Sequence, residues 1–591
     1  MQTNQSITTL LKRLWHHISP RRRSQFGLLL VLMVVASFAE IISIGAALPF
    51  LGVLAAPERV FKHNAAEPLI QFLGITSPEQ LLMPVTISFG IAAFTAGSVR
   101  LLLLWTSTRL SNAIGADISI NIYRRTLYQP YSVHVSRNSS GVINGIYGKA
   151  KVATSVINMT LTIISSFIML VTILFALLLV EPVLTSAMLG GIGLIYIITI
   201  KTTRRRLLIN SQRIAKESNQ AIKSLQEGLG GIRDVLINRS QEIYCTIYRN
   251  ADLALRNASA ENMFISAAPR YVMDTLGMIL IAVLAYTVAQ QLDGIDKAIP
   301  ILGTLAMGTQ RLLPILQQAY GAWSTISGAQ ASLQDALDLL DQKIPDYADQ
   351  LISKPLSFTQ QISLKQLSFS YSQQMPYVLD NINLIIKKGS RIGFIGTTGS
   401  GKSTLLDIVM GLLHPSEGLI EVDGQAITAK NQCAWQSHIA HVPQSIYLAD
   451  ATIEENIAFG IPENRIDVDR MRAAAKQAKI ADTIEAWPQQ YKTVVGERGI
   501  RLSGGQRQRI GIARALYKRA DVIIFDEATS ALDNETEQYV MKAIESLSDT
   551  LTVLIIAHRL TTLKNCNQVI QLENGKVKCI GSYREVISVS G

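Results

Sequence analysis

The chain is short of cysteine and of charge. Its 591 residues include 4 cysteines, and Asp, Glu, Lys and Arg together make up 17% of them. Cys245, Cys433, Cys566 and Cys579 have neither a CxxC spacing nor another metal-ligand spacing, so free thiols in a reducing cytosol are expected. Soluble domains carry roughly a quarter of charged residues. The low charge, together with 48% hydrophobic residues, excludes disorder of the whole chain and argues against an ordinary cytosolic enzyme.

The charge that is present is divided unevenly along the chain. Residues 1–340 contain 28 Lys and Arg against 17 Asp and Glu, whereas residues 341–591 contain 27 basic and 27 acidic residues. The basic part is also the apolar part. A basic, apolar segment of this length indicates a membrane domain rather than a nucleic-acid-binding domain, so no nucleic-acid partner is expected.

Six apolar stretches are long enough to cross a bilayer as helices, which takes about 20 residues each. They lie at 26–54, 82–110, 156–180, 183–200, 267–290 and 298–322. Their continuous apolar character favours helices, because barrel strands would alternate every second residue. We expect an α-helical membrane domain with six spans over 1–335, with helical extensions into the cytosol, a linker over 336–358 and a second domain over 359–591.

Two long connections between the spans carry much of the positive charge. Their basic residues are Arg124, Arg125, Lys149 and Lys151 in the first connection, and Lys201, Arg204, Arg205, Arg206, Arg213 and Lys216 in the second. Basic loops stay on the cytoplasmic side, so we expect a multi-pass protein of the inner (plasma) membrane with both chain ends in the cytoplasm. The first outer loop, 55–80, has the spacing of an amphipathic helix on the membrane surface, with a plain loop as the alternative.

Four ionisable residues lie in or near the spans: Glu40, Arg100, Asp274 and Arg311. A charge at the centre of a bilayer costs about 3 kcal/mol or more, so each of them is expected to face a cavity or a partner. One interpretation is a polar path for a charged substrate. The other is an ion pair within the membrane, or Arg100 reaching towards one membrane surface. The sequence leaves both interpretations open.

A glycine-rich loop follows a short apolar strand, 392–395, in the polar half of the chain. The loop matches GxxxxGK[ST] and consists of Gly396, Thr397, Thr398, Gly399, Ser400, Gly401, Lys402 and Ser403, with Thr404 next. Glycines let backbone amides wrap around phosphates, Lys402 reaches the β and γ oxygens, and Ser403 offers its hydroxyl to Mg²⁺. The following helix directs its N-terminus at the negative charge. The pattern predicts binding of ATP with Mg²⁺.

A second apolar strand, 522–525, ends in two acids. Asp526 is placed to hold the magnesium ion, and Glu527 can polarise a water molecule towards the γ-phosphate. Such a run is weak evidence alone, but beside the phosphate loop it predicts an ATPase.

Leu502, Ser503, Gly504, Gly505 and Gln506 lie between these two motifs, and with them the C-terminal part of the chain resembles the nucleotide-binding domain of ATP-binding cassette transporters. The resemblance implies an α/β P-loop ATPase domain of the ABC type. In this family, the LSGGQ segment closes over the ATP that the partner domain holds. A dimer is therefore implied, with a second copy of the chain as the first expectation and a heterodimer as the alternative.

The resemblance also implies roles for residues outside these motifs. Tyr371 matches the aromatic residue that stacks on adenine, and Gln444 matches the glutamine that contacts magnesium and senses the membrane domain. Asp533 belongs to the loop that follows the catalytic glutamate, and His558 matches the switch histidine.

A six-span domain before one nucleotide-binding domain resembles a half-transporter of the exporter type. The resemblance implies two small transverse helices that dock on the nucleotide-binding domains, near 129–138 and 236–242. Residues 37–50 are similar to the opening span of lipid-linked oligosaccharide flippases and cyanobacterial envelope-polysaccharide exporters. We therefore expect ATP-driven export or flipping of a lipid-linked saccharide, glycolipid or polysaccharide precursor, with membrane lipids and this amphipathic substrate as partners.

Two alternatives stay open. A multidrug, hydrophobic small-molecule or peptide exporter would have the same architecture. An ATP-gated channel or channel regulator would share it too, but such chains often show an altered glutamate or LSGGQ segment, and both are intact in this sequence.

Overall fold

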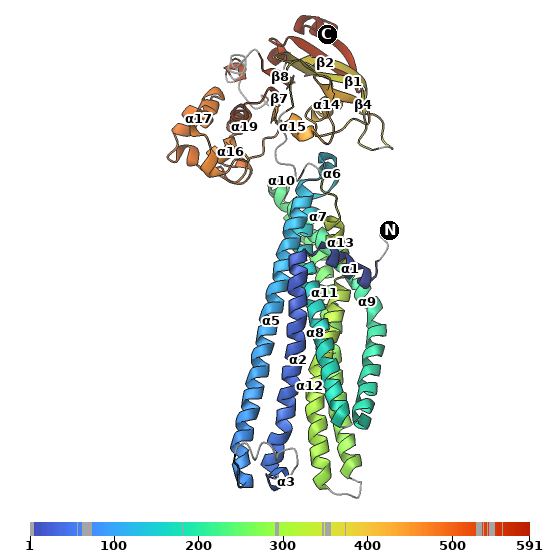
Figure 1. Ribbon diagram of the computed structural model, residues 1–591. Helices are drawn as coiled ribbons and strands as arrows, with labels where there is room; N and C mark the ends of the chain where they lie inside the picture. Colours follow the sequence, from blue (N-terminus) through green and yellow to red (C-terminus); the bar gives the residue numbers. More distant parts are fainter. Residues whose placement is uncertain are drawn as a thin grey trace. The chain divides into compact units, whose positions relative to one another are not determined.

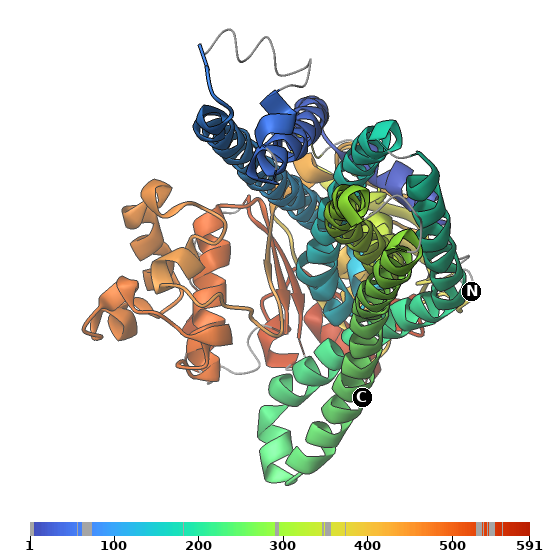
Figure 2. The ribbon, with the colours of Figure 1, turned by 90° about the horizontal axis from the view of Figure 1, so that it is seen from below.

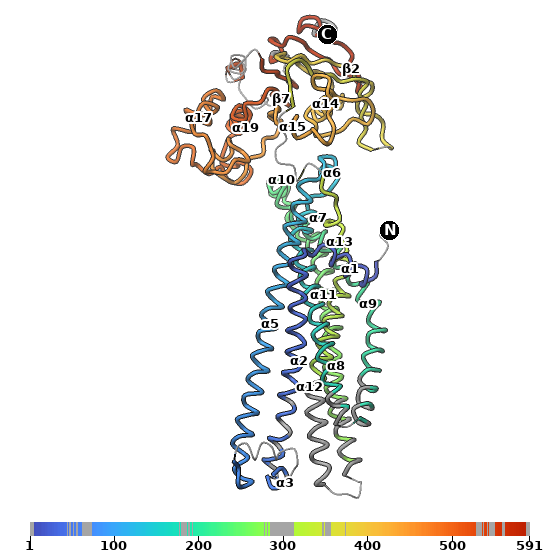
Figure 3. The backbone as a smooth tube through the Cα atoms, in the orientation of Figure 1, coloured from blue at the N-terminus to red at the C-terminus, as the bar shows by residue number. Residues whose placement is uncertain are grey.

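The computed structural model divides the chain into two compact units. The first unit comprises Met1–Tyr128 and Arg137–Lys343, and the second comprises Gln129–Ser136 and Ile344–Gly591. The structure describes residues 5–55, 57–61, 74–180, 182–289, 295–345, 348, 356–372, 374–527, 535, 537–539, 542, 550–557 and 560–590 (Figure 3).

Long helices build the first unit (Figure 1). They are α2 (Pro20–Ala55), α5 (Leu82–Leu127), α8 (Ala150–Val180), α9 (Pro182–Gly230), α11 (Gln241–Ala289) and α12 (Ile295–Gly328). Within the described residues, three stretches are long and apolar enough to cross a membrane, namely Pro20–Ser43, Pro78–Leu127 and Ser139–Phe175. Large apolar side chains point away from the protein on these helices, and Phe94 and Leu101 of α5 are 78% and 68% exposed. An exposed apolar surface of this kind is typical of contact with lipid or with another protein, which agrees with a membrane-embedded protein of several spans.

Short helices connect the long ones. They are α1 (Ile7–His17), α3 (Pro57–Phe61), α6 (Tyr131–Ser136), α7 (Ser139–Asn144), α10 (Ile232–Ile237) and α13 (Gln330–Leu340), and residues 145–149 form a π-helical turn. α10 joins α9 to α11, which lie side by side (green in Figure 2). α3 lies in the loop where an amphipathic helix was predicted, and residues 62–73 of that loop lie outside the described part.

The two predicted transverse helices compare differently with the structure. α6 lies inside the range 129–138. The second prediction, 236–242, is wrong in its position, because α10 occupies Ile232–Ile237 and α11 begins at Gln241. Arg239 has a φ of 49°, a left-handed conformation that a helix cannot contain, so the chain turns there. The linker predicted over 336–358 begins inside α13, whose Ala336, Leu337 and Leu340 are buried.

The second unit contains two sheets. Its strands are β1 (Gln361–Phe369), β2 (Leu379–Lys387), β3 (Arg391–Ile395), β4 (Glu417–Val422), β5 (Gln425–Ala426), β6 (Ile439–Val442), β7 (Val522–Asp526), β8 (Thr552–Ile556), β9 (Gln568–Glu573) and β10 (Lys576–Gly581). The antiparallel sheet has the order β2-β1-β4-β5. The larger sheet has the order β10-β9-β3-β8-β7-β6, and β9, β3, β8, β7 and β6 are parallel.

Helices pack against the cores of the larger sheet. Among them are α14 (Lys402–Val409), α15 (Gln432–Gln436), α19 (Gly504–Lys518) and α21 (Tyr583–Ser590). Three further helices, α16 (Ile453–Ile457), α17 (Val468–Gln477) and α18 (Ala481–Glu485), precede α19 in the chain, and α16 and α17 pack against it. Because β7 is covered on both faces, its side chains alternate between two cores: Ile523 and Phe525 pack in one core, and Val522 and Ile524 in the other. A helical membrane unit is thus followed by an α/β unit, which confirms the predicted fold class.

Candidate functional site

Parallel register gathers the candidate nucleotide residues at one edge of the larger sheet. Val442 is paired with Phe525, Asp526 with Ile556, and Phe394 with Ile556, so β6, β7, β8 and β3 end at the same level. Ligands of parallel sheets bind outside these carboxyl ends. The phosphate loop, Gln444 and the acid pair 526–527 all follow these ends directly.

Three glycines make the phosphate loop possible. Gly396, Gly399 and Gly401 have φ values of 150°, 85° and 96°. A Cβ at Gly396 would lie 2.2 Å from the backbone oxygen of Leu572, and a Cβ at Gly401 would lie 2.7 Å from Leu379. Side chains are therefore excluded for both steric and conformational reasons. The loop leads into α14, whose first helical residue is Lys402, and an arrangement of this kind is suited to hold an anion.

The Lys402 ammonium lies inside this loop. Its Nζ donates to the backbone oxygens of Gly396 at 2.8 Å and Thr397 at 3.0 Å. Burial lowers the pKa of Lys402, and the charges of Glu527 and Asp526 act in the opposite direction. Thr397, Thr398 and Gly399 are exposed at the crest of the loop, whereas Ser400 and Gly401 are buried. The positive charge is thus held where phosphate oxygens would meet it.

Asp526 and Ser403 form a donor set for a divalent cation. Burial raises the pKa of Asp526, and the neighbouring Glu527 raises it further, while a hydrogen bond from Ser403 and the charge of Lys402 lower it. A half-buried pair of acids beside a hydroxyl provides the oxygen ligands that Mg²⁺ prefers. The residues therefore fit a magnesium ion bound together with a nucleotide.

Glu527 is fixed by its backbone and by its side chain. Its backbone N–H donates to the carbonyl of Ile556 at 3.0 Å, and its carboxylate accepts a hydrogen bond from Gln444 Nε2 at 2.6 Å. Its φ of 51° is unusual for a residue other than glycine. Such strain collects at functional sites.

Tyr371 stands beside the first turn of α14. Its hydroxyl lies 3.1 Å from the Thr404 hydroxyl, and its ring packs edge-on against Phe369 at 5.0 Å between centroids. The residue is 51% exposed, so part of the ring remains available to a flat ligand.

The LSGGQ segment forms the N-terminus of α19. The Ser503 hydroxyl accepts from the Gln506 N–H at 3.2 Å, and the Gln506 side chain accepts from the Ser503 N–H at 2.8 Å. This capping box fixes the first turn, which begins with Gly504 and Gly505. Ser503 is exposed, so the helix N-terminus presents its N–H groups to an external anion.

Three predicted residues cannot be placed in the site. Asp533 and His558 lie outside the described residues, and Arg311 belongs to α12 but its side chain is outside the described part. Sequence reasoning also missed one residue near the site. Burial, with a smaller contribution from Asp526, raises the pKa of Asp407 to about 6. The available signal was a single acid in the otherwise apolar second half of α14.

The membrane unit brings two of the predicted charges together. Arg100 Nη2 lies 2.7 Å from Glu40 Oε1, and the Glu40 side chain is 2% exposed against 45% for Arg100. Asp274 has different contacts: it accepts from Gln317 Nε2 at 3.0 Å and lies 3.8 Å from Arg270 Nε.

A cavity of about 620 Å³ lies between α2, α5, α8 and α12. Its polar lining residues are Ser37, Arg100, Ser107, Asn158, Thr162, Ser165 and Gln318. Met33, Leu103 and Met169 are among its apolar lining residues. The cavity is therefore amphipathic and carries one cationic side chain among its described lining residues.

Comparisons with known proteins agree with this geometry. The family described as ABC transporter matches residues 379–530, and the family described as ABC transporter transmembrane region matches residues 26–301. An ATP-dependent lipid A-core flippase of Saccharophagus degradans is 32% identical over 81% of this chain and 81% of its own length. A protein of the same name from Cupriavidus metallidurans is 26% identical over 100% of this chain and 96% of its own length.

Solved structures give the same fold. A bacterial Atm1-family ABC exporter with ATP bound has a TM-score of 0.79 and 24% identity, covering 97% of this chain and 96% of its own. The phosphate loop, the acid pair and the LSGGQ helix lie in one α/β unit that follows a helical membrane unit in the chain. This chain therefore belongs to the ABC transporter family, as a half-transporter whose transmembrane domain precedes one ATPase domain.

Proposed function

We propose that two copies of this chain form a homodimer in the inner membrane that uses ATP hydrolysis to flip or export an amphipathic lipid carrying a saccharide head group. Both chain ends lie in the cytoplasm. Support comes from the relatives named ATP-dependent lipid A-core flippase, which share both domains with this chain.

The observation that carries the choice of substrate is the amphipathic cavity of the membrane unit. Its apolar wall suits acyl or prenyl chains, and its hydroxyl and amide groups suit a saccharide. Arg100 suits an anionic linkage such as phosphate, because a guanidinium stays charged and donates paired hydrogen bonds. One of its nitrogens contacts Glu40, but a guanidinium has five N–H donors. The pair with Glu40 and a contact with substrate are therefore compatible.

The residues of the ATPase site have different roles in nucleotide binding and hydrolysis. The loop 396–403 and Lys402 bind the β- and γ-phosphates, and Tyr371 stacks on the adenine. Glu527 accepts a proton from the attacking water as general base, and Gln444 orients its carboxylate. Mg²⁺, when bound by Ser403, Asp526 and Gln444, would neutralise phosphate charge. From the family resemblance, His558 is assigned the role of the switch histidine, and Asp533 is assigned to the loop that follows the catalytic glutamate.

The LSGGQ helix explains why a dimer is needed. Ser503, Gly504 and Gly505 offer a hydroxyl and backbone amides at the exposed N-terminus of α19. In the dimer, these groups contact the ATP that the partner chain holds. Closure of the two ATPase domains then drives the membrane domains towards an outward-facing state.

Reconstitution in proteoliposomes tests the proposal. Three fluorescent probes are compared: a lipid-linked saccharide, a phospholipid without saccharide and a hydrophobic dye, each scored by its accessibility to an external reductant. We expect ATP-dependent flipping of the saccharide lipid, with none in the Glu527→Gln chain. Movement of the dye alone would support a multidrug exporter. Passage of a probe without continuous hydrolysis would support a channel.

A further inference from the structure

A short helix packs against the membrane unit before its first span. α1 is capped by the Ser6 side chain, and its Leu10 and Leu14 are buried in a core that also contains Leu333 and Leu337 of α13. These apolar contacts fix one side of α1 on α13. They leave its polar edge and its outer face for other interactions.

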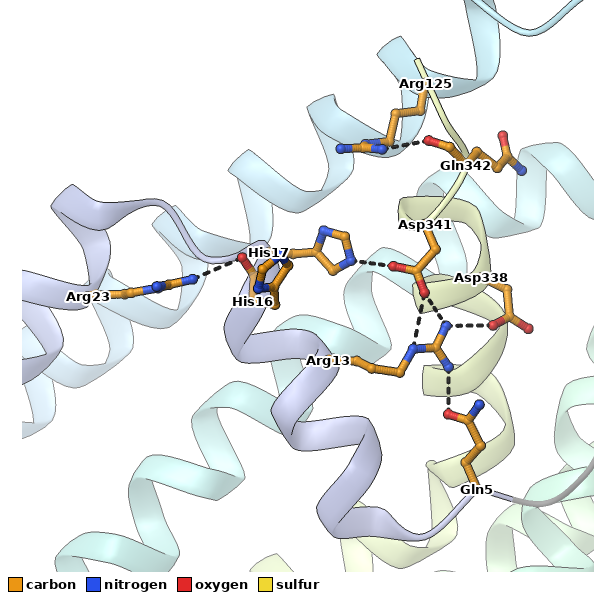
Figure 4. Close-up of polar contacts among 9 residues, drawn as sticks. All are labelled: Gln5, Arg13, His16, His17, Arg23, Arg125, Asp338, Asp341 and Gln342. Carbon is orange, nitrogen blue, oxygen red and sulfur yellow. Dashed lines mark hydrogen bonds and ion pairs between the residues drawn. The ribbon is translucent and has the colours of Figure 1, made fainter. Parts of the chain in front are cut away.

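The polar edge of α1 is bound to acids of α13 and the residue that follows it (Figure 4). The Arg13 guanidinium donates to Asp338 at 2.8 Å and to Asp341 at 2.5 Å, and His17 Nε2 lies 2.6 Å from Asp341. Burial would lower the pKa of Arg13, but the hydrogen bonds that Arg13 donates to both carboxylates, together with their charges, outweigh it and raise that pKa. The same contacts hold the pKa of Asp341 below its ordinary value although burial acts to raise it. Arg13 and Asp341 are therefore firmly charged partners.

The C-terminal end of α1 also contacts the start of α2. Arg23 donates to the backbone oxygen of His16 at 2.9 Å (Figure 4). It also donates to the backbone oxygen of Trp15 at 2.9 Å, and its guanidinium lies 5.6 Å from the centre of the Trp15 ring. The Trp15 ring packs edge-on against Phe26 at 5.2 Å. These contacts hold α1 against the start of the first candidate span, which begins at Pro20.

The outer face of α1 and the first turn of α2 are basic and aromatic. Lys12, Trp15, His16 and Arg21 are exposed. Among the described residues, neither Lys12 nor Arg21 has an ion-pair partner, whereas Arg22 is paired with Asp117 at 2.9 Å. Tryptophan favours the boundary between membrane and water, and basic residues beside a span attract anionic lipids.

We propose that Lys12, Trp15 and Arg21 form a docking surface for anionic lipid headgroups, and that Arg13 transmits lipid binding to α13. The occupant is a bilayer lipid rather than a soluble protein, because the surface is continuous with the start of the span and its charge is complementary to an anionic leaflet. None of the residues Lys12, Trp15 and Arg21 lines the substrate cavity or belongs to the ATPase motifs.

The contacts of α13 explain how lipid binding at α1 would affect the rest of the chain. Arg125 of α5 donates to the backbone oxygen of Gln342 at 2.5 Å, and Lys149 lies 2.6 Å from Asp335. With Arg13, basic residues from three elements therefore hold α13 and the residues just after it. The chain passes into the second unit at Ile344. A shift of α1 is thereby carried to the segment that leads into the ATPase domain.

Lipid binding is measured through Trp15 fluorescence in full-length protein in phosphatidylcholine nanodiscs. Traces of brominated phosphatidylglycerol or brominated phosphatidylcholine are added, and the Trp15 signal is the difference between the wild type and Trp15→Phe. We expect stronger quenching by the anionic lipid, with the preference reduced about fivefold by Lys12→Gln and by Arg21→Gln each. Lys223→Gln, which removes an exposed charge of α9, is the matched control and leaves the preference unchanged.

Several outcomes would overturn the docking surface. Equal quenching by the two lipids would do so, and so would a full anionic preference in the Lys12→Gln/Arg21→Gln chain. If neither brominated lipid quenches Trp15 while acrylamide is also excluded, a protein segment covers the surface and the lipid proposal fails.

The proposed transmission of lipid binding from α1 to α13 is tested by measuring the ATPase rate in nanodiscs with and without phosphatidylglycerol. We expect the wild-type rate to change about fivefold, a typical size for coupling between sites. Arg13→Gln and Asp341→Asn should each abolish that response while keeping the Trp15 preference and nucleotide binding. The exchange Arg13→Asp/Asp341→Arg should restore part of the response even if one single variant folds poorly. A full lipid response in both single variants would overturn the role of Arg13.

Discussion

Gln444 donates a hydrogen bond to the carboxylate of Glu527 across 2.6 Å, and so joins the loop after β6 to the end of β7. The two residues are 83 positions apart in sequence. The contact occurs because β6 and β7 are parallel neighbours whose ends lie at the same level. It holds the acid that we propose as general base in one orientation beside Asp526.

The first prediction concerns Glu527. Glu527→Gln should retain ATP binding but lose about 10²–10⁴-fold in steady-state hydrolysis, the usual contribution of a general base. Gln444→Ala should slow hydrolysis less, because it removes the orientation of the carboxylate and one proposed magnesium ligand but leaves the general base in place. Phosphate release and nucleotide binding on the same preparation separate the two effects. Turnover close to that of the wild type in Glu527→Gln would show that another group is the base.

The second prediction concerns the dimer. One chain carrying Lys402→Ala is combined with one carrying Ser503→Arg, with a different affinity tag on each. If Ser503 acts on the partner's ATP, both defects fall on one composite site and the other site stays intact. Nucleotide trapped at one site per dimer is the expected result. Two equally damaged sites would contradict the assembly in trans.

The third prediction concerns the ion pair in the membrane. Arg100→Ala should reduce lipid flipping and remove the cation that pairs with the buried Glu40 carboxylate, at a cost in stability. The double variant Arg100→Ala/Glu40→Gln removes that cost. If Arg100 binds the head group, the double variant assembles and hydrolyses ATP but does not flip the lipid. Flipping is compared in proteoliposomes, with Arg100→Lys as the conservative control.

Rescue of flipping by the double variant would instead assign Arg100 a structural role. Arg311→Ala is measured beside it, because its sequence position gave it the same expected role. Normal flipping in both Arg100→Ala and Arg311→Ala would exclude the head-group role for these arginines.

The fourth prediction concerns Asp407 and pH. Its pKa in the folded protein is about 6, above the ordinary value of 3.8, so folding favours the protonated carboxyl. Its contribution to stability is complete below about pH 4 and is lost as the pH rises through 6. Asp407→Asn cannot lose a proton, so its thermal unfolding temperature relative to the wild type should rise between pH 5 and pH 7.5. Unfolding of the full-length protein in detergent, followed over this range, measures the difference.

Asp423 provides the contrasting control. Burial would raise its pKa, but hydrogen bonds from the backbone N–H groups of Gln361, Thr359 and Gln360 lower it. Its contribution is therefore present at neutral pH and is lost only as the pH falls below its ordinary range. Asp423→Asn should be less stable than the wild type by the same amount at pH 5 and pH 7.5. The same pH trend in both variants would contradict the assignment to Asp407.

Motifs whose residues lie close together in the chain could be predicted from the sequence. Gly396, Gly399 and Gly401 recur at the spacing that a phosphate loop needs, and each has the positive φ that the pattern requires. The capping box of Ser503 and Gln506 spans a single helical turn, so local sequence determines it. Hydrophobic length likewise indicated helices in the membrane domain, because a bilayer demands long apolar runs.

The positions of short helices in less regular segments were harder to predict. The second transverse helix begins four residues before the expected start, because Arg239 turns the chain in a conformation that composition does not reveal. Asp407 was missed for a related reason. Its pKa depends on burial, which the apolar residues around it only suggest, and on Asp526, which is far away in sequence.

Local periodicity and spacing in the sequence were enough to establish the class of the two domains and to predict the phosphate-binding residues. Which distant charges form contacts depends on the packing of the helices. Arg100 is paired with Glu40 while Asp274 contacts Gln317, and Arg13 binds Asp341 across 328 positions. Ion pairs need approach within a few ångströms, and only the packing of helices in three dimensions sets that distance.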